Sequence, residues 1–189
     1  MVAKLVRPAL SALVNSFTSK SVKILLSISG LVYSAGWIVG FLSCKLFLPP
    51  EGPIVPIHNS GVIQILVHNL RAGAPILAGV ATFGFTTFFF LIMNGIVAGF
   101  AAASAQKVMG WEQVCLRILP HGLFEIPATV AWGAAGFSSV WWVLTRMFDI
   151  GVEEKFWHHV LVLIAAGGIL LAIAAVIEGA ITYRFALNS

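Results

Sequence analysis

Long apolar stretches, separated by short polar or proline-rich segments, make up most of this chain. Four of them, residues 22–48, 74–104, 119–148 and 157–184, contain the roughly 20 apolar residues that a helix needs to cross a bilayer. We interpret them as the transmembrane regions of a single membrane domain spanning residues 1–189. The pattern predicts an all-α fold, a polytopic helical membrane bundle with four main transmembrane helices.

The first 21 residues follow a different pattern. Lys4, Arg7 and Lys20 accompany apolar side chains at roughly helical spacing, which predicts an interfacial amphipathic helix. A signal peptide is the alternative. The apolar run that follows, Ile24 to Leu48, is longer than the core of about 7–15 residues found in signal peptides, so a retained segment is favoured.

Two segments in the middle of the chain are ambiguous. Residues 62–72 are predicted as a short helix at the outer interface, where Asn69 and Arg71 can bind carbonyls or a deeper carboxylate; alternatively, Arg71 extends to lipid head groups. Residues 74–104 would measure about 46 Å as one helix, too long for one untilted crossing. Either the helix tilts and projects from the membrane, or it breaks near Asn94. A broken span would make five crossings.

Small residues at helical spacing predict close helix packing, in which dispersion and weak polar contacts hold the helices together. The spacing does not distinguish packing within the chain from contact with a second copy. The candidate packing positions are Gly36, Gly40, Gly95, Gly99, Gly133 and Gly136.

The composition supports a membrane protein. The chain is 59% hydrophobic and only 10% charged, against about 25% charged residues in soluble domains. Its net charge of +4 comes from scattered basic residues, which argues against a nucleic-acid partner. Under the positive-inside rule, both termini and the loop 105–118 are predicted to face the cytoplasm. This topology places Cys44 and Cys115 on opposite sides, where no disulfide could join them.

The most informative motif is Leu119-Pro120-His121-Gly122-Leu123-Phe124-Glu125-Ile126-Pro127. In a helix, His121 and Glu125 share one face at a spacing of four residues, and Pro127 predicts a kink near Ile126. Glu178 is the second carboxylate within apolar sequence. With Asn94, these side chains could bind a cation or relay protons, or they could form a hydrogen-bonded network that holds the helices in place.

This motif, followed by the small residues Gly133 to Gly136, resembles the stage II sporulation protein M family of integral membrane proteins. His68 to Arg71, leading to Asn94-Gly95, and Ala174 to Glu178 extend the resemblance over Val62 to Tyr183. It implies a non-enzymatic membrane component, in spore formers an anchor and scaffold for peptidoglycan-degrading partners during engulfment. The motif positions that carry over are Pro120, His121, Gly122, Glu125 and Pro127, with Asn94, Gly95 and Glu178 as weaker matches.

The sequence lacks the usual catalytic patterns. No His-Glu-x-x-His element is present, and His121-x-x-x-Glu125 does not replace one. The adjacent His158 and His159 point about 100° apart on a helix and are poor co-ligands, so no metal or cofactor is expected. We therefore predict a scaffold or complex subunit that binds the lipid bilayer and membrane or envelope proteins, with homo-oligomerisation left open. The alternative is a small channel, a transporter or a transporter subunit that uses the intramembrane His/Glu/Asn cluster.

Overall fold

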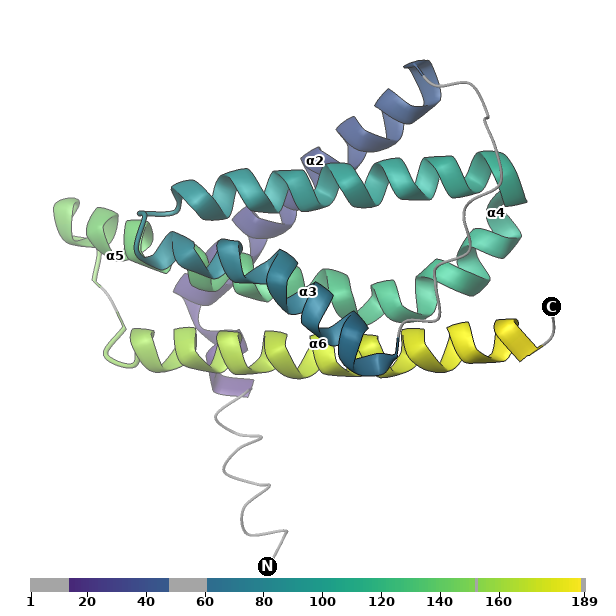
Figure 1. Cartoon of the computed structure of the whole chain (residues 1–189). Coiled ribbons are helices and arrows are strands. Elements are labelled where there is room, and N and C mark those ends of the chain that lie inside the picture. Colours follow the sequence, from purple (N-terminus) through teal and green to yellow (C-terminus); the bar gives the residue numbers. More distant parts are fainter. Residues whose placement is uncertain (1–13, 48–60, 152, 188–189) are drawn as a thin grey trace, which may run out of the picture.

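The computed structural model describes the backbone of residues 14–47, 61–151 and 153–187, and their side chains except at 117–119, 121 and 181–187. The predicted interfacial helix 1–21 therefore lies mostly outside the described residues. The described part is helical and contains no strand, which confirms the all-α fold (Figure 1). Its elements are α2 (Lys20–Phe47), α3 (Val62–Leu77), η1 (Ala78–Val80), α4 (Phe85–Gly136), α5 (Ser138–Met147) and α6 (Phe156–Leu187).

Helix α4 folds back on itself at Gly110. This residue has φ 77° and ψ 167°, a conformation that glycine adopts at little cost because it has no Cβ. The fold divides α4 into a first arm (85–109) and a second arm (111–136), which Figure 1 shows as two layers. The predicted kink near Ile126 is not a break in the backbone, since Gly110 is the residue of α4 with non-helical torsion angles.

The chain turns between η1 and α4, inside the region 74–104 that was predicted to be one span. Phe83 and Gly84 have positive φ, and the N–H of Gly84 donates to the carbonyl of Gly79 at 2.8 Å. The alternative break near Asn94 is wrong, because the first arm is helical there. The predicted short helix 62–72 is instead the beginning of a 19-residue segment, Val62–Val80, long and apolar enough to cross a membrane.

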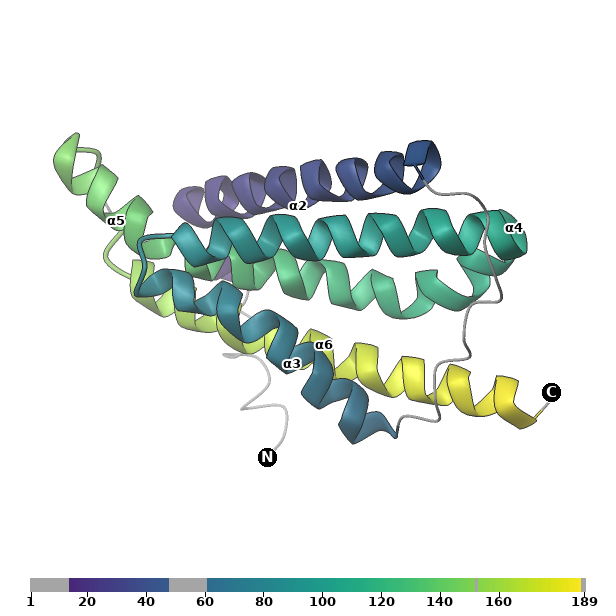
Figure 2. The ribbon, with the colours of Figure 1, turned by 45° about the horizontal axis from the view of Figure 1, so that its top comes forward.

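The order of helix contacts establishes how the chain runs. Gly36 of α2 packs on Ile92 of the first arm and Gly40 on Ile96, so these two helices are parallel. The second arm returns in the opposite direction, and α3 runs alongside it with Gly73 next to Trp132. Figure 2 shows α6 running antiparallel to the second arm. The chain thus traverses the bundle five times.

Five traverses place the start of α2 and the end of α6 at opposite ends of the bundle (Figure 2). The near end contains the start of α2, the turn 81–84 and residues 137–151 and 153–155. The far end contains the end of α2, Gly110 and the end of α6. As predicted, four described helices are long and apolar enough to cross a membrane, namely Lys20–Phe47, Val62–Val80, Phe85–Leu116 and Phe156–Ala180. The second arm of α4 adds a further traverse, so the predicted topology with both termini on one side does not match this path (Figure 2). Nor do the predicted positions of the cysteines, since Cys44 and Cys115 both lie toward the far end, where both are free.

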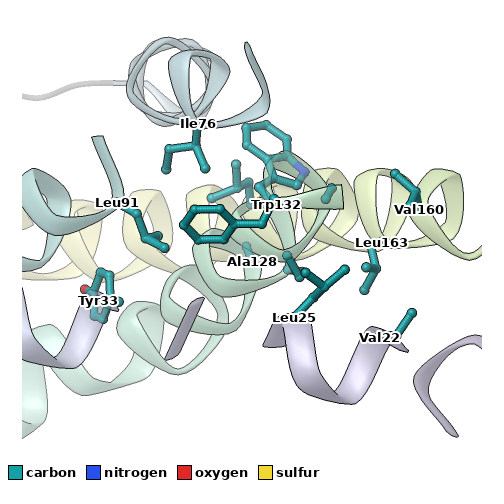
Figure 3. Close-up of a cluster of buried hydrophobic side chains, with 14 of the residues drawn as sticks. Val22, Leu25, Tyr33, Ile76, Leu91, Ala128, Trp132, Val160 and Leu163 are labelled. Carbon is teal, nitrogen blue, oxygen red and sulfur yellow. The ribbon is translucent and has the colours of Figure 1, made fainter. Parts of the chain in front are cut away.

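Trp132 of the second arm joins three helices. Its ring lies between Gly73 of α3 and Gly167 of α6, at positions where a Cβ on either glycine would overlap it. The indole Nε1 donates a 2.9 Å hydrogen bond to the carbonyl of Ile164. Figure 3 shows the ring among the buried side chains of the hydrophobic core, to which α2, α3, both arms of α4 and α6 contribute.

The predicted region 119–148 is also divided. The second arm ends at Gly136, and the ten-residue α5 projects from the near end of the bundle (Figures 1 and 2). The guanidinium of Arg146 lies 5.5 Å from the ring centroid of Trp142. Tryptophan and arginine are typical of membrane interfaces, so α5 carries side chains that suit the surface of a bilayer.

Candidate functional site

The two carboxylates of the predicted polar cluster face different helices. Glu125, half-buried on the second arm, interacts electrostatically with Tyr33 of α2. Glu178, half-buried on α6, precedes Gly179, which packs against Val62 at the start of α3. The contacts described for the two carboxylates therefore involve different helices.

The remaining members of the cluster are engaged locally or lie outside the described side chains. The amide of Asn94 donates to the carbonyl of Phe90 in its own helix at 2.8 Å. Pro120, Gly122 and Pro127 lie within the helical second arm, and the side chain of His121 is outside the described part. Among the described residues, no three His, Cys, Asp or Glu side chains are grouped so that they could hold a metal ion.

The candidate packing glycines all lie against neighbouring helices. Gly95 and Gly99 of the first arm contact the backbone of α2 near Trp37, opposite Gly36 and Gly40. A Cβ at any of these positions would overlap backbone atoms, which cannot move aside as a flexible side chain can. Gly133 lies against the side chains of Ser29 and Leu91, and Gly136 lies against Thr87 and the carbonyl of Ile76. These contacts are all within one chain.

A polar clasp at the near end joins the start of α2 to the loop before α6. The carboxylate of Glu153 accepts hydrogen bonds from the hydroxyl of Ser19 and from the backbone N–H groups of Lys20 at 3.0 Å and Ser21 at 3.4 Å. The first N–H groups of a helix lack partners within the helix and carry partial positive charge. The carboxylate therefore caps α2 from a residue more than 130 positions away in the sequence.

The clasp continues through His159 of α6, whose Nδ1 lies 2.9 Å from the hydroxyl of the buried Ser16. Its Nε2 lies 3.7 Å from the Glu153 carboxylate. Burial alone would raise the pKa of Glu153, but the hydrogen bonds from Ser19, Ser21 and Lys20 and the electrostatic interaction with His159 outweigh it and lower the pKa. Since Ser16 is fully buried, the arrangement suits helix capping better than nucleophilic attack.

Sequence reasoning missed this clasp. Ser19, directly before the long apolar run, was a local signal, because serine is a preferred N-cap residue. Nothing in the sequence near Ser19 indicates Glu153 as its partner.

Helix α3 carries polar side chains on two faces. Its inward face is Ile65, Asn69, Gly73 and Ile76, all buried. The amide nitrogen of Asn69 has no hydrogen-bond partner among the described residues. The outward face contains Gln64, His68 and Arg71, which are exposed and spaced along one side of the helix. The two predicted site residues of α3, Asn69 and Arg71, therefore point in different directions.

Comparisons with known proteins agree with the family resemblance of the motif at Pro120 to Pro127. Residues 29–183 match the family described as stage II sporulation protein M. The chain is 32% identical over 172 residues to an uncharacterized protein of Methanocaldococcus jannaschii, covering 87% of this chain and 97% of the relative. No solved structure matches. The family match spans most of the chain, including both arms of α4 and the motif at Pro120 to Pro127, so this membrane protein belongs to the stage II sporulation protein M family.

Proposed function

We propose that this protein is a non-enzymatic membrane scaffold, a subunit that binds other membrane or envelope proteins. Family membership is the first support, because the resemblance implies an anchor for partners that remodel the cell envelope. We also propose that the five traverses of the bundle are five membrane crossings, which would expose the two ends of the chain on opposite sides of the membrane.

The observation that carries the scaffold proposal is the exposed polar face of α3. Arg71 lies in the middle of the apolar segment Val62–Val80 and makes no hydrogen bond or ion pair with any described residue. An arginine at the centre of a lipid-facing helix costs about 2.5–3.5 kcal/mol on insertion scales. A protein partner that covers this face would remove the cost, and a subunit built for assembly needs such a surface.

The packing inside the bundle supports a scaffold better than a channel. The glycines of α2 and of the first arm bring the two backbones into contact, which leaves no space along this seam. A transporter using Glu125 and Glu178 would need the two carboxylates to act on one solute. Glu125 instead interacts electrostatically with Tyr33 of α2, and Glu178 lies near the first residue of α3.

The proposal is tested by lipid-preserving extraction of the tagged native chain, followed by mass measurement and mass spectrometry of the intact complexes. We expect a complex of defined stoichiometry with membrane or envelope proteins, and no ion flux when the purified chain is placed in vesicles. A homo-oligomer without partners that conducts protons, sodium, potassium or divalent cations would contradict the proposal. Loss of that flux in a folded Glu125→Gln variant would identify the alternative function.

A further inference from the structure

The outward face of α3 has a chemical character that specifies its partner. Arg71 lies nine residues from each end of the segment Val62–Val80, or about 14 Å at 1.5 Å per residue. This distance is close to half of the roughly 30 Å hydrocarbon thickness of a bilayer. When α3 crosses the membrane, Arg71 is therefore near mid-depth, where an arginine side chain has the longest path to either layer of head groups.

Arg71 cannot turn into its own bundle. The inward face of α3 is occupied by Asn69 and Gly73 on either side of it, and Gly73 is in contact with the Trp132 ring. His68, one turn before Arg71 on the same outward face, is exposed as well. The cation and the imidazole thus point together, away from the core.

No carboxylate of the described residues forms an ion pair with Arg71. Glu178 lies near the level of Val62, which is about 14 Å along α3 from Arg71. Glu125 interacts with Tyr33 of α2. A second copy in the same orientation would hold its Glu178 about 14 Å from the depth of Arg71, so the Glu178 carboxylate of that copy would not be the counter-ion.

We infer that the outward face of α3 binds a transmembrane helix of another protein that carries a carboxylate near the middle of the bilayer, with Arg71 as its counter-ion. A guanidinium binds a carboxylate through two parallel hydrogen bonds, and the low dielectric of the membrane strengthens this pair. His68 would offer a second polar contact one turn away. This inference rests on the proposed scaffold function and names the class of partner that the scaffold binds.

A model helix provides a direct test with the full-length chain. The purified protein, labelled at the exposed Cys115, is reconstituted in phosphatidylcholine vesicles with a leucine–alanine transmembrane peptide of about 20 residues. The peptide carries either one glutamate or one glutamine at its centre and an energy-transfer acceptor at one end. We expect the glutamate peptide to bind at least tenfold more tightly than the glutamine peptide. Equal binding would overturn the inference, and this comparison needs no protein variant.

Variants of the protein then show which residue causes the preference for the glutamate peptide. Arg71→Gln should abolish the preference for the glutamate peptide, and Arg71→Lys should retain part of it, because lysine keeps the charge but not the two-pronged geometry. Arg146→Gln on α5 is the matched control and should keep the full preference. A preference that survives Arg71→Gln in a chain of unchanged helicity would refute the role of Arg71.

The experiments give different results if an anionic lipid or a second copy of the chain occupies the outward face of α3. If an anionic lipid neutralises Arg71, adding phosphatidylglycerol will remove the preference for the glutamate peptide. If a second copy covers the face, differently labelled copies will show energy transfer that Arg71→Gln abolishes, without any peptide. Either result overturns the inference while leaving the scaffold proposal standing, provided that native extraction still yields complexes with other proteins.

Discussion

The carboxylate of Glu153, in the loop before α6, accepts a 3.0 Å hydrogen bond from the backbone N–H of Lys20, the first residue of α2. This contact caps a membrane helix from a distant part of the chain and closes the near end of the bundle. Because it depends on an ionised carboxylate, it makes the stability of the bundle sensitive to pH.

Glu153→Gln should lower the free energy of unfolding near pH 7 by about 1 kcal/mol, the usual contribution of a helix cap. Folding lowers the pKa of Glu153 below its ordinary value of 4.5. The stability it contributes is therefore complete above that value and is lost as the pH falls through the lower, folded-state pKa. Thermal unfolding in detergent between pH 3 and pH 7 should show wild type and variant converging at the acidic end.

The control for this experiment is Glu154→Gln. Glu154 is exposed and makes no hydrogen bond or ion pair with described residues, so its variant should follow the wild-type curve. A Glu153→Gln variant with the same difference from wild type at every pH would show that the carboxylate charge does not hold α2.

Gly40→Ala should destabilise the bundle by about 1–3 kcal/mol, the usual cost of overpacking, because the new Cβ would overlap the Ile96 backbone. Gly30 is on the same helix, and no atom of another helix lies within 4 Å of its Cβ position. Gly30→Ala should be neutral or stabilising, as alanine is the better helix former. Unfolding of both variants in mixed micelles measures the difference, and equal effects would argue against parallel packing of α2 on the first arm.

Two adjacent glycines of α6 test the contact with Trp132. Gly167→Ala would push against the indole ring, whereas the Cβ position of Gly168 is open. We expect Gly167→Ala to lower the free energy of unfolding by about 1–3 kcal/mol and Gly168→Ala to leave it nearly unchanged. The intrinsic tryptophan fluorescence should shift in the first variant, because the environment of Trp132 changes, and remain as in wild type in the second.

The direction of the helices predicts which residues share a side of the membrane. Single cysteines replacing Lys23 and Lys155 should react alike with a membrane-impermeant thiol reagent in oriented vesicles, because both residues lie at the near end. A cysteine replacing Lys45, at the far end, should show the opposite accessibility. The background for all three is the double variant Cys44→Ser and Cys115→Ser. Opposite labelling of positions 23 and 155 would support the four-span topology instead.

A variant of Glu125 tests whether the charge of this motif residue contributes to the binding of partner proteins. If the scaffold proposal holds, Glu125→Gln should leave the recovery of native complexes within about twofold, since Gln keeps the size of the side chain while removing its charge. The measurement is quantitative mass spectrometry after lipid-preserving extraction. Complete loss of partners from a folded variant would indicate that the charge of Glu125 contributes to assembly.

The sequence by itself determined that this is an all-α membrane protein, because the number and length of apolar runs are local properties that reflect the thickness of a bilayer. It also identified Gly36, Gly40, Gly95 and Gly99, since small residues at helical spacing permit close backbone contact whichever helix is the neighbour. The family resemblance was equally accessible, because it rests on contiguous motifs.

Only the tertiary structure decided how these helices pair and in which direction they run. The fold-back at Gly110 depends on one glycine with positive φ, and the sequence around it resembles an ordinary polar connection. The turn at Phe83 and Gly84 is hidden in the same way within a continuous apolar run. Because a run of hydrophobic residues is equally compatible with one tilted helix or with two joined by a turn, local pattern could not choose between them.

The orientation and contacts of the polar side chains also depend on the tertiary structure. Asn69 and Arg71 are two positions apart on α3. Which of the two faces the core depends on how α3 packs against its neighbours, in particular on the contact between Gly73 and Trp132. Glu153 and Lys20 meet because the four traverses from α2 to the second arm bring the chain back to the near end, where α6 begins. Contacts between residues so far apart in the sequence follow from packing of the whole bundle, which no local pattern records.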